Sequence, residues 1–576
     1  MPATLKRYGL SQIINHLLAL GACTCDRGNV PPLLSPAAGQ SRAPRTLTRS
    51  PPTPTPKKTT TDPPRPFDFL INGELVRRSL EQHLLQHNRS LEQAVEIEYV
   101  PAVPPPAPRG APPEPQDDWV SCAAALPSST IGGAPLATGC YDGVVRLWRA
   151  GAGMQEEQEE GASSLLPSVE PAGAFIAHCG GVTAAAAAGL AAGSASASLL
   201  ATAGKDHAAR LWRLEASIGR GTKKTATATT ITAVPLAELA GHSDTVEALA
   251  VAAGSNGRCA TGGWDGQLLV WRCGRELERA AADEPAGAST PAAKKRRVRR
   301  GGEDEQEEQE ELRRAPVVER PLARLVLAAA GESASAAAAG GHCVSALAWP
   351  TRSSLYSGAY DHSVRRWDVE AGVPVASCPT GRPVLSLAAP APLLPAADEE
   401  ADEGGEAAGG HLVAFGSADG ALRVWDARAG PQVALAAGPD AASAAAAVDS
   451  SSSAALGAAA ARVASSAAAA AGGGGAWVPS VAWRPGSLHH VATAAHDGAV
   501  RLFDLRSPVP LGTLAGLHGS GGEDKALCVA WWSGGGGGGG NGGGGGGGVP
   551  RFLASGGTDC RLRVSGLPAG CGEGIL

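Results

Sequence analysis

The chain of 576 residues is poor in aromatic residues, which make up only 4% of it. Its hydrophobic fraction of 43% overstates the core, because alanine runs inflate that figure. The twelve cysteines form no Cys-x-x-Cys pair, and Cys23 and Cys25 are too close together to indicate a zinc site. A reduced, intracellular protein is therefore expected. Because no signal peptide and no apolar run of membrane length are found, we expect no membrane contact.

The sequence also lacks the patterns that carry catalysis. We find no nucleophile paired with a base, no phosphate-binding loop and no cluster of metal ligands. The formal net charge of −6 is an average over segregated basic and acidic runs, so it predicts little about partners. The sequence therefore predicts a non-enzymatic protein that holds no cofactor.

A short motif that occurs seven times dominates what is present. In its first copy an apolar run breaks at Asp142-Gly143, and alternating apolar and polar residues then lead to Trp148. An Asp-Gly pair between two such runs is typical of a β-hairpin turn. The turn aspartates of the seven copies are Asp142, Asp206, Asp265, Asp361, Asp419, Asp497 and Asp559. A Gly-His or Ala-His pair precedes three copies and supplies His178, His242 and His342.

This repeat resembles the WD-repeat family, in which each unit is one four-stranded blade of a β-propeller. The resemblance implies an all-β, seven-bladed propeller over residues 117–570. It also implies that the turn aspartates and upstream histidines share hydrogen bonds that fix the blades, so we expect them to be structural. Only two copies end in Trp-Asp, at Trp367 and Trp425. Low-complexity insertions are expected at about residues 274–318, 395–410, 436–475 and 533–549.

Before the repeats, residues 1–100 predict a small α+β domain. Helical periodicity covers residues 5–20, and a segment rich in Pro and Thr, predicted to be disordered, follows at about 23–66. A hairpin with an Asn72-Gly73 turn is predicted for residues 67–76. Ser79 and Gln82 form a capping box for a short helix, and alternation over residues 95–99 predicts a last strand. A Pro-rich linker over residues 101–116 leads to the first blade.

Three segments of this domain carry a more specific resemblance. Residues 7–11, 67–75 and 95–99 are similar to the ubiquitin-like N-terminal domain of the WD repeat-containing protein 12 family of ribosome biogenesis factors. The family's opening β-hairpin has no counterpart before Leu5, and residues 23–66 interrupt the domain. The resemblance implies a ubiquitin-like domain followed by a propeller, as the order of motifs in this chain indicates.

The same resemblance implies a function and partners. Members join pescadillo and the block-of-proliferation protein in a nuclear complex of the nucleolus and nucleoplasm. That complex acts in maturation of large-subunit ribosomal RNAs and in assembly of the large-subunit precursor particle. The ubiquitin-like domain is grasped by midasin, an AAA-type ATPase that removes the factor from the particle.

Glu92 is the residue to which this resemblance gives a special role. From its spacing alone, it is a solvated carboxylate in the loop between the short helix and the last strand. The resemblance implies instead that Glu92 completes the coordination of a metal ion held by midasin, since carboxylate oxygen suits a hard cation. The metal would then belong to the partner.

A basic run occupies the insertion after the third copy, at Lys294, Lys295, Arg296, Arg297, Arg299 and Arg300. It is either a solvated loop, a nuclear import signal or a nucleic-acid patch. The acidic run at residues 303–311 would repel phosphate, which favours import.

Two other functions remain open from the sequence. A propeller alone would also suit the substrate receptor of a ubiquitin ligase, although the N-terminal motifs favour ribosome biogenesis. Direct RNA binding would require a basic propeller face and a strongly salt-dependent affinity.

Overall fold

The computed structural model forms two compact units, Met1–Ala102 and Val103–Leu576. No helix among the residues that it describes is long and apolar enough to span a membrane. The structure describes residues 10, 12, 66–77, 79–87, 95–126, 135–151, 169–189, 198–218, 229–252, 257–272, 317–318, 321, 323–326, 342–351, 354–390, 410–429, 435–436, 476–507, 510–519, 524–533 and 550–567.

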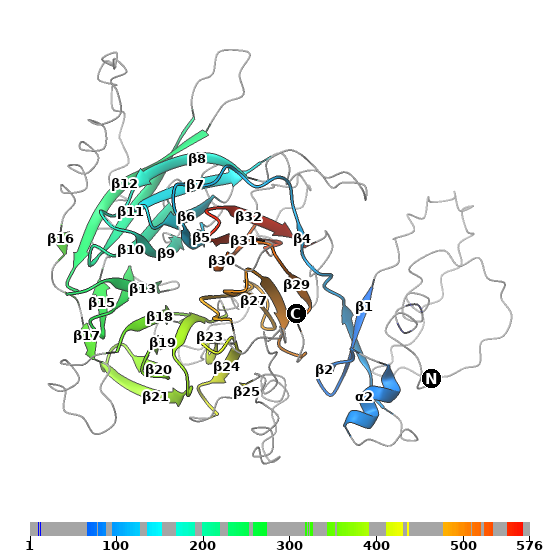
Figure 1. Ribbon diagram of the computed structural model, residues 1–576. Coiled ribbons are helices and arrows are strands. Elements are labelled where there is room, and N and C mark those ends of the chain that lie inside the picture. Colours follow the sequence, from blue (N-terminus) through cyan, green and yellow to red (C-terminus); the bar gives the residue numbers. More distant parts are fainter. Residues whose placement is uncertain are drawn as a thin grey trace, which may run out of the picture. The chain divides into compact units, whose positions relative to one another are not determined.

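The first unit is a three-stranded antiparallel sheet packed against one short helix (Figure 1). The sheet has the strand order β2-β1-β3, and its core includes Phe67, Phe69, Leu80 and Leu84. Positive φ angles of 52° at Asn72 and 76° at Gly73 allow the tight turn between β1 and β2. The elements are β1 (Phe67–Ile71), β2 (Glu74–Leu75), α2 (Leu80–Gln86) and β3 (Glu98–Pro101).

Most of the elements predicted for this unit are confirmed. The hairpin lies where its turn predicted it, and the Ser79 side chain accepts a hydrogen bond of 3.3 Å from the Gln82 amide at the start of α2. The last strand begins three residues later than predicted, because Val95 and Ile97 pack against the core without pairing. Of the predicted helix at residues 5–20 only residues 10 and 12 are described, both helical. The insertion predicted at 23–66 lies outside the described residues, except for its last residue.

The second unit is a propeller of seven antiparallel sheets, which Figure 1 shows around a central axis. This confirms the predicted all-β, seven-bladed fold. Blades 1 and 2 comprise β5 (Val120–Ala125), β6 (Leu136–Cys140), β7 (Val144–Ala150), β8 (Val169–Ile176), β9 (Val182–Gly189), β10 (Ser198–Gly204), β11 (Ala208–Ile218) and β12 (Thr229–Ala240). Blades 3 and 4 comprise β13 (Val246–Val251), β14 (Arg258–Gly263), β15 (Gln267–Arg272), β17 (Ala323–Val326), β18 (Val344–Ala348), β19 (Ser354–Ala359), β20 (Ser363–Asp368) and β21 (Val373–Pro379).

The last three blades complete the ring. They comprise β22 (Val384–Ala388), β23 (Leu412–Ser417), β24 (Leu422–Asp426), β25 (Leu435–Ala436), β26 (Ser480–Trp483), β27 (His490–Ala494), β28 (Val500–Asp504), β29 (Gly512–Leu514), β30 (Ala526–Trp532), β31 (Phe552–Gly557), β32 (Leu562–Gly566) and β4 (Ala107–Pro108). The first strand of each blade lines the axis, and the last lies at the periphery (Figure 1).

Strand β4 closes the ring from the other end of the chain. Pro108 pairs with Ser565 of β32, so a segment that precedes the first blade supplies the outer strand of the last one. The Arg109 amide extends this contact by donating to the Val564 carbonyl at 2.9 Å. Residues 101–116, expected to be a linker, therefore belong partly to the propeller. A two-residue strand among prolines has no periodicity that could predict it, and proline is tolerated there because the strand lies at an edge.

A further short strand joins blade 2. Strand β16 (Val317–Val318) pairs in parallel with β12 and makes this sheet five-stranded. It falls at the end of the insertion expected at about 274–318. The rest of that insertion, and nearly all of the other three, lie outside the described residues.

Adjacent blades approach closely because small residues face large ones. A Cβ added to Gly262 would lie 2.5 Å from a methyl carbon of Val344 in the next blade. The same contact joins the last blade to the first, where a Cβ on Gly556 would lie 2.4 Å from Val120. Glycine at these two positions of the second strand therefore leaves room for the valine of the next blade. A chain poor in aromatic residues can fill such narrow spaces with valine and alanine.

Candidate docking surface

The network of histidines and aspartates inside the blades is present in blades 2 and 3. His178 Nδ1 lies 2.8 Å from Asp206, and its Nε2 lies 2.9 Å from the Thr202 hydroxyl. In blade 3, His242 makes the equivalent contacts with Asp265 at 3.0 Å and Thr261 at 2.8 Å. Both histidine side chains are fully buried. Their geometry is that of a bracing network inside a blade.

The last blade contains the same network, with a histidine that the sequence analysis missed. His518 Nδ1 lies 2.9 Å from Asp559, and its Nε2 lies 2.9 Å from the Ser555 hydroxyl. The residue before it is Leu517, so a search for Gly-His and Ala-His pairs passes over it. A search for any histidine upstream of each turn aspartate, whatever residue precedes that histidine, would have found His518.

His342 differs from this pattern. Its side chain is exposed, and no contact in the described part of the chain joins it to Asp361. Asp361 instead accepts hydrogen bonds from the Ser363 amide at 3.0 Å and the Ser363 hydroxyl at 2.7 Å. Ser363 therefore donates to Asp361 the hydrogen bonds that we expected from His342.

A second missed feature is an arginine four residues after the turn aspartate. Six of the seven turn aspartates form an ion pair with it, and Asp265 is the exception, because Leu269 occupies that position. The pairs are Asp142–Arg146, Asp206–Arg210, Asp361–Arg365, Asp419–Arg423, Asp497–Arg501 and Asp559–Arg563.

Contacts of this kind favour the ionised form of Asp265 and Asp419. Burial is the largest single effect on Asp265 and disfavours its charged form, but the hydrogen bond and charge of His242, together with two backbone amides, outweigh burial and lower the pKa of the carboxyl group. The pKa of Asp419 is lowered in the same way, by the hydrogen bond and charge of Arg423. The carboxylates are thus committed to structural hydrogen bonds, and the site that can meet a partner must lie elsewhere.

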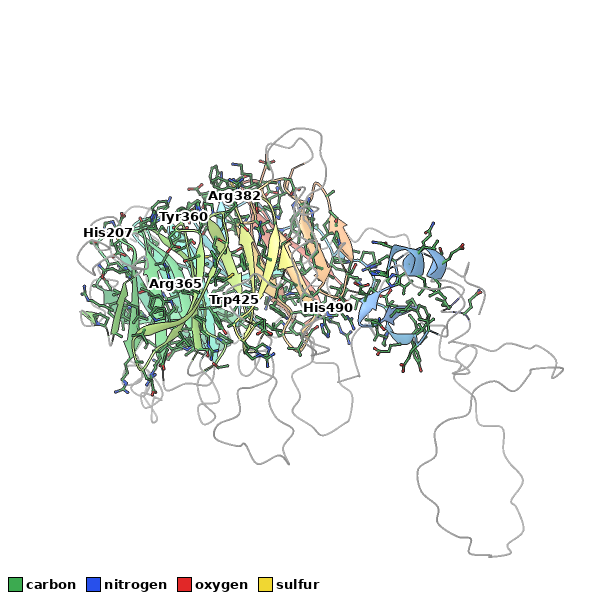
Figure 2. The ribbon with its side chains drawn as sticks, turned by 90° about the horizontal axis from the view of Figure 1, so that it is seen from below. His207, Tyr360, Arg365, Arg382, Trp425 and His490 are labelled. Atoms are coloured by element: carbon green, nitrogen blue, oxygen red, sulfur yellow. The ribbon has the colours of Figure 1, made fainter. Side chains whose placement is uncertain are left out.

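The residue before each turn aspartate defines one end of the propeller. Its amide donates a hydrogen bond to a backbone carbonyl one to three residues before the inner strand of the same blade, for example from Trp264 to Thr245 at 2.9 Å and from His496 to Trp477 at 2.9 Å. Because successive strands are antiparallel, all seven of these turns lie at the same end. In Figure 2 the labelled residues His207, Tyr360 and Arg382 mark that edge.

Aromatic side chains gather at this end, and we call them the aromatic rim. Three large hydrophobic side chains in it are strongly exposed: Trp119 at 47%, Trp264 at 45% and Trp477 at 48%. Among the described propeller residues, only Val373 and Val375 are comparably exposed large hydrophobics. The aromatic rim comprises Trp119, Tyr141, Trp264, Tyr360, Trp477 and His496.

The rings of the aromatic rim support one another. Trp264 and Tyr360 meet edge to face with their centroids 5.5 Å apart, and this contact joins blade 3 to blade 4. The ring of Trp477 stacks on His496, also at 5.5 Å. Such pairs hold large rings in place before a partner arrives, which lowers the entropy lost on binding.

The aromatic rim is electrically neutral near pH 7. Burial is the main cause that raises the pKa of Tyr141 and of Tyr360 to about 12, so both hydroxyl groups stay protonated. Burial, helped by the charge of Lys525, lowers the pKa of His496 to about 4. Exposed, neutral and preordered aromatic rings are typical of the centre of protein interfaces.

The central channel has few side chains that could bind a partner. The inner strands line it with small side chains, and its hydroxyl groups already brace neighbouring blades: Ser345 donates to the Val384 carbonyl at 2.6 Å, and Ser386 to the Val478 carbonyl at 3.1 Å. Glu247, also at the channel, accepts a hydrogen bond from the Trp264 indole at 3.3 Å. The aromatic rim is therefore the better candidate for a binding site.

Two of the sites predicted from the sequence cannot be placed. Glu92 and the basic residues between Lys294 and Arg300 lie outside the described residues.

Comparison with known proteins defines the class first. The WD domain, G-beta repeat family matches residues 113–149, 233–272 and 337–368, which together with the seven blades makes this a WD-repeat propeller protein. A "Ribosome biogenesis protein WDR12 homolog" of Chlamydomonas reinhardtii is 35% identical over 574 residues, covering 98% of this chain and 92% of that protein. This chain belongs to the WDR12/Ytm1 family of ribosome biogenesis proteins, as the N-terminal motifs indicated.

Two other relatives support the same family assignment. The WDR12 homolog of Oryza sativa subsp. japonica is 29% identical over 535 residues, covering 92% of this chain and 87% of that protein. "Ribosome biogenesis protein ytm1" of Neosartorya fischeri is 27% identical over 402 residues, covering 67% of this chain and 63% of that protein.

Proposed function

We propose that this chain is a non-enzymatic ribosome assembly factor. It acts in maturation of large-subunit ribosomal RNAs and in assembly of the large ribosomal subunit. The observation that carries this proposal is similarity to a ribosome biogenesis protein over 98% of the chain, which spans the N-terminal unit as well as the propeller. Similarity confined to the blades would fit any propeller scaffold.

The propeller is the docking platform in this proposal. The aromatic rim binds pescadillo or the block-of-proliferation protein, and so anchors the complex on the large-subunit precursor particle. Support comes from the three exposed tryptophans and from the uncharged side chains of Tyr141, Tyr360 and His496 that pack beside them. An apolar aromatic surface suits a protein partner better than a phosphate backbone, whose binding depends on lysine and arginine.

The N-terminal unit is the handle in this proposal. Midasin grasps it, Glu92 completes the coordination of the metal that midasin holds, and the factor leaves the particle. The ubiquitin-like motifs support this role, and their hairpin and short helix are folded as the sequence predicted. The protein acts in the nucleolus and nucleoplasm, and the basic run at residues 294–300 directs its import.

Affinity purification of the full chain followed by mass spectrometry tests the proposal. We expect pescadillo, the block-of-proliferation protein, midasin and large-subunit precursors to be recovered together. Recovery of ubiquitin-ligase subunits without these proteins would replace the proposal with a substrate-receptor function. Recovery of RNA alone, in a strongly salt-dependent manner, would favour direct RNA binding.

A further inference from the structure

Three potential metal ligands converge in the N-terminal unit. Glu74 is the first residue of β2, directly after the hairpin turn. His83 lies in α2, and His87 caps the end of that helix. Residues four apart in a helix share one face, so the two imidazoles project to the same side. Leu80 and Leu84 are buried and pack the helix into the core that contains the hairpin, which brings that face to Glu74.

The distances suit a single ion. His87 Nε2 lies 3.0 Å from Glu74 Oε2, and His83 Nε2 lies 3.8 Å from the same oxygen. The three ligand atoms all lie within 4.8 Å of one another. Ligands bonded at about 2.0–2.2 Å in tetrahedral geometry are separated by roughly 3.3–3.6 Å. The two measured separations fall on either side of that value, so small side-chain rotations would bring the atoms onto one ion.

The environment is also suitable. The side chains of His83 and Glu74 are 11% and 16% exposed, which limits their motion, whereas His87 is 35% exposed and leaves a path from solvent. The two imidazole rings already lie with their centroids 4.6 Å apart. A site with two partly buried ligands and one accessible ligand can be entered without unfolding the domain.

We propose that Glu74, His83 and His87 bind one divalent transition-metal ion, zinc in the cell, with the fourth position open to water. Imidazole nitrogen selects zinc over magnesium or calcium, which prefer oxygen ligands. Both histidines bind in the neutral form, so any proton that they carry is released on binding. The ion links the β1–β2 hairpin to the end of α2. A small core contributes little stability by packing alone, so such a link would stabilise this unit further.

This site is independent of the proposed role of Glu92. Its three ligands come from one chain, whereas Glu92 would contribute to an ion that another protein holds. The two can be separated experimentally, because the new site is measured on the purified full chain without any partner.

Cobalt(II) titration of the full chain, purified with its thiols reduced, is the direct test. We expect one equivalent of tight binding that gives the visible bands of a four-coordinate cobalt site with nitrogen and oxygen ligands, displaced by zinc. His87→Ala should weaken binding at least tenfold, and Glu74→Gln should do the same. His342→Ala is the matched control, because it removes an exposed histidine of the propeller and should leave binding unchanged.

A second measurement locates the ion. Zinc should slow hydrogen exchange in the peptides that contain α2 and the β1–β2 hairpin of the wild-type chain, and not in those of His87→Ala. Sulfur-to-cobalt charge-transfer bands, or unchanged affinity in both variants, would overturn the proposal in favour of a cysteine site such as the exposed Cys179. Failure of the folded wild-type chain to bind either metal would overturn the proposal and leave Glu74, His83 and His87 as a structural cluster.

Discussion

The imidazole of His242 lies with its Nδ1 3.0 Å from both carboxylate oxygens of Asp265. A carboxylate only accepts hydrogen bonds, so Nδ1 carries the proton, and in a neutral ring Nε2 then accepts one from the Thr261 hydroxyl at 2.8 Å. The same hydroxyl oxygen accepts from the Trp271 indole at 2.9 Å. Every donor in this chain of four side chains has an acceptor, and the network ties the turn to the third strand of the blade.

Removing the carboxylate from this network should destabilise the propeller. Asp265→Ala leaves the buried Nδ1–H without its acceptor, since the Asp265 side chain is only 4% exposed and no water replaces it easily. We expect a loss of roughly 1–3 kcal/mol in the free energy of unfolding, measured by chemical denaturation. Asp244→Ala, at an exposed aspartate two residues after His242, is the control and should cost far less. Equal stability of wild type and Asp265→Ala would refute the bracing role.

Stability should fall as the pH is lowered through the range in which buried histidines titrate. Burial lowers the pKa of His490 from 6.5 to about 4 in the folded state. Between these values the unfolded chain binds more protons, so the contribution is fully present above pH 6.5 and is lost as the pH falls to about 4. Each pH unit in this window costs at most about 1.4 kcal/mol for one group.

The variant His490→Gln isolates that contribution. It should flatten the dependence of the unfolding free energy on pH between 6.5 and 4. The remaining slope should come from His178, His489 and His496, whose pKa values burial also lowers. An unchanged slope in His490→Gln would show that this histidine is already protonated, or solvated, in the folded protein.

The aromatic rim should dominate binding to the protein partner. Trp264 is 45% exposed, so Trp264→Ala should weaken capture of the partner by roughly 30-fold or more, as loss of an interface hot spot does. The loss of its contacts with Tyr360 and Glu247 should lower thermal stability only modestly. Val375→Ala removes an exposed apolar side chain from the outer strand β21 and should change neither quantity. Equal capture by both variants in a quantitative pulldown would place the docking site elsewhere.

Replacing all six basic residues from Lys294 to Arg300 by alanine should shift a fluorescent fusion toward the cytoplasm, because a compact cluster of positive charge is what import receptors recognise. Replacing an equal number of acidic residues between Glu303 and Glu311 is the control for altered charge in the same segment. A mutant of the basic run that still concentrates in the nucleolus would show that import depends on another signal or on a partner.

Glu92→Ala should separate assembly from release. The variant should still assemble with pescadillo but accumulate on precursor particles, since in our proposal it removes the oxygen ligand that completes the coordination of the metal held by midasin. Glu92→Asp should be partly tolerated, because it keeps the carboxylate but withdraws it by one methylene. Sucrose-gradient sedimentation measures the accumulation. Normal midasin binding and normal release by Glu92→Ala would transfer the role to another acidic residue, such as Glu96 or Glu98.

The periodic features of this chain were predictable and the single contacts were not. The Asp-Gly turns predict the blades, because the turn requires a residue with positive φ after each aspartate. Gly143 and Gly266 adopt that conformation, with φ of 83° and 72°. Where His207, His362 or Cys560 occupies that position, the chain adopts the same conformation without the usual residue, and only the repeat reveals the turn.

Pairing across long distances in the sequence escaped prediction. His518 was missed because its role depends on Asp559, a partner that folding brings near, and not on the residue beside it. The same holds for the cluster of Glu74, His83 and His87, which combines a strand with a helix and has no motif of its own. The aromatic rim was not predicted either, since its six members come from four different blades and only folding brings them to the same end of the propeller.

The pairing of β4 with β32 sets an order of events during synthesis. Residue 565 is made 457 residues after its partner, residue 108. At about 5–20 residues per second, the outer strand of blade 7 waits on the order of 20–90 s for the strand that it must join. Until then the nascent ring has two open edges, and unpaired strand edges attract other chains. Chaperone cover during translation would therefore protect these edges, and a truncation that removes β32 would leave the ring open.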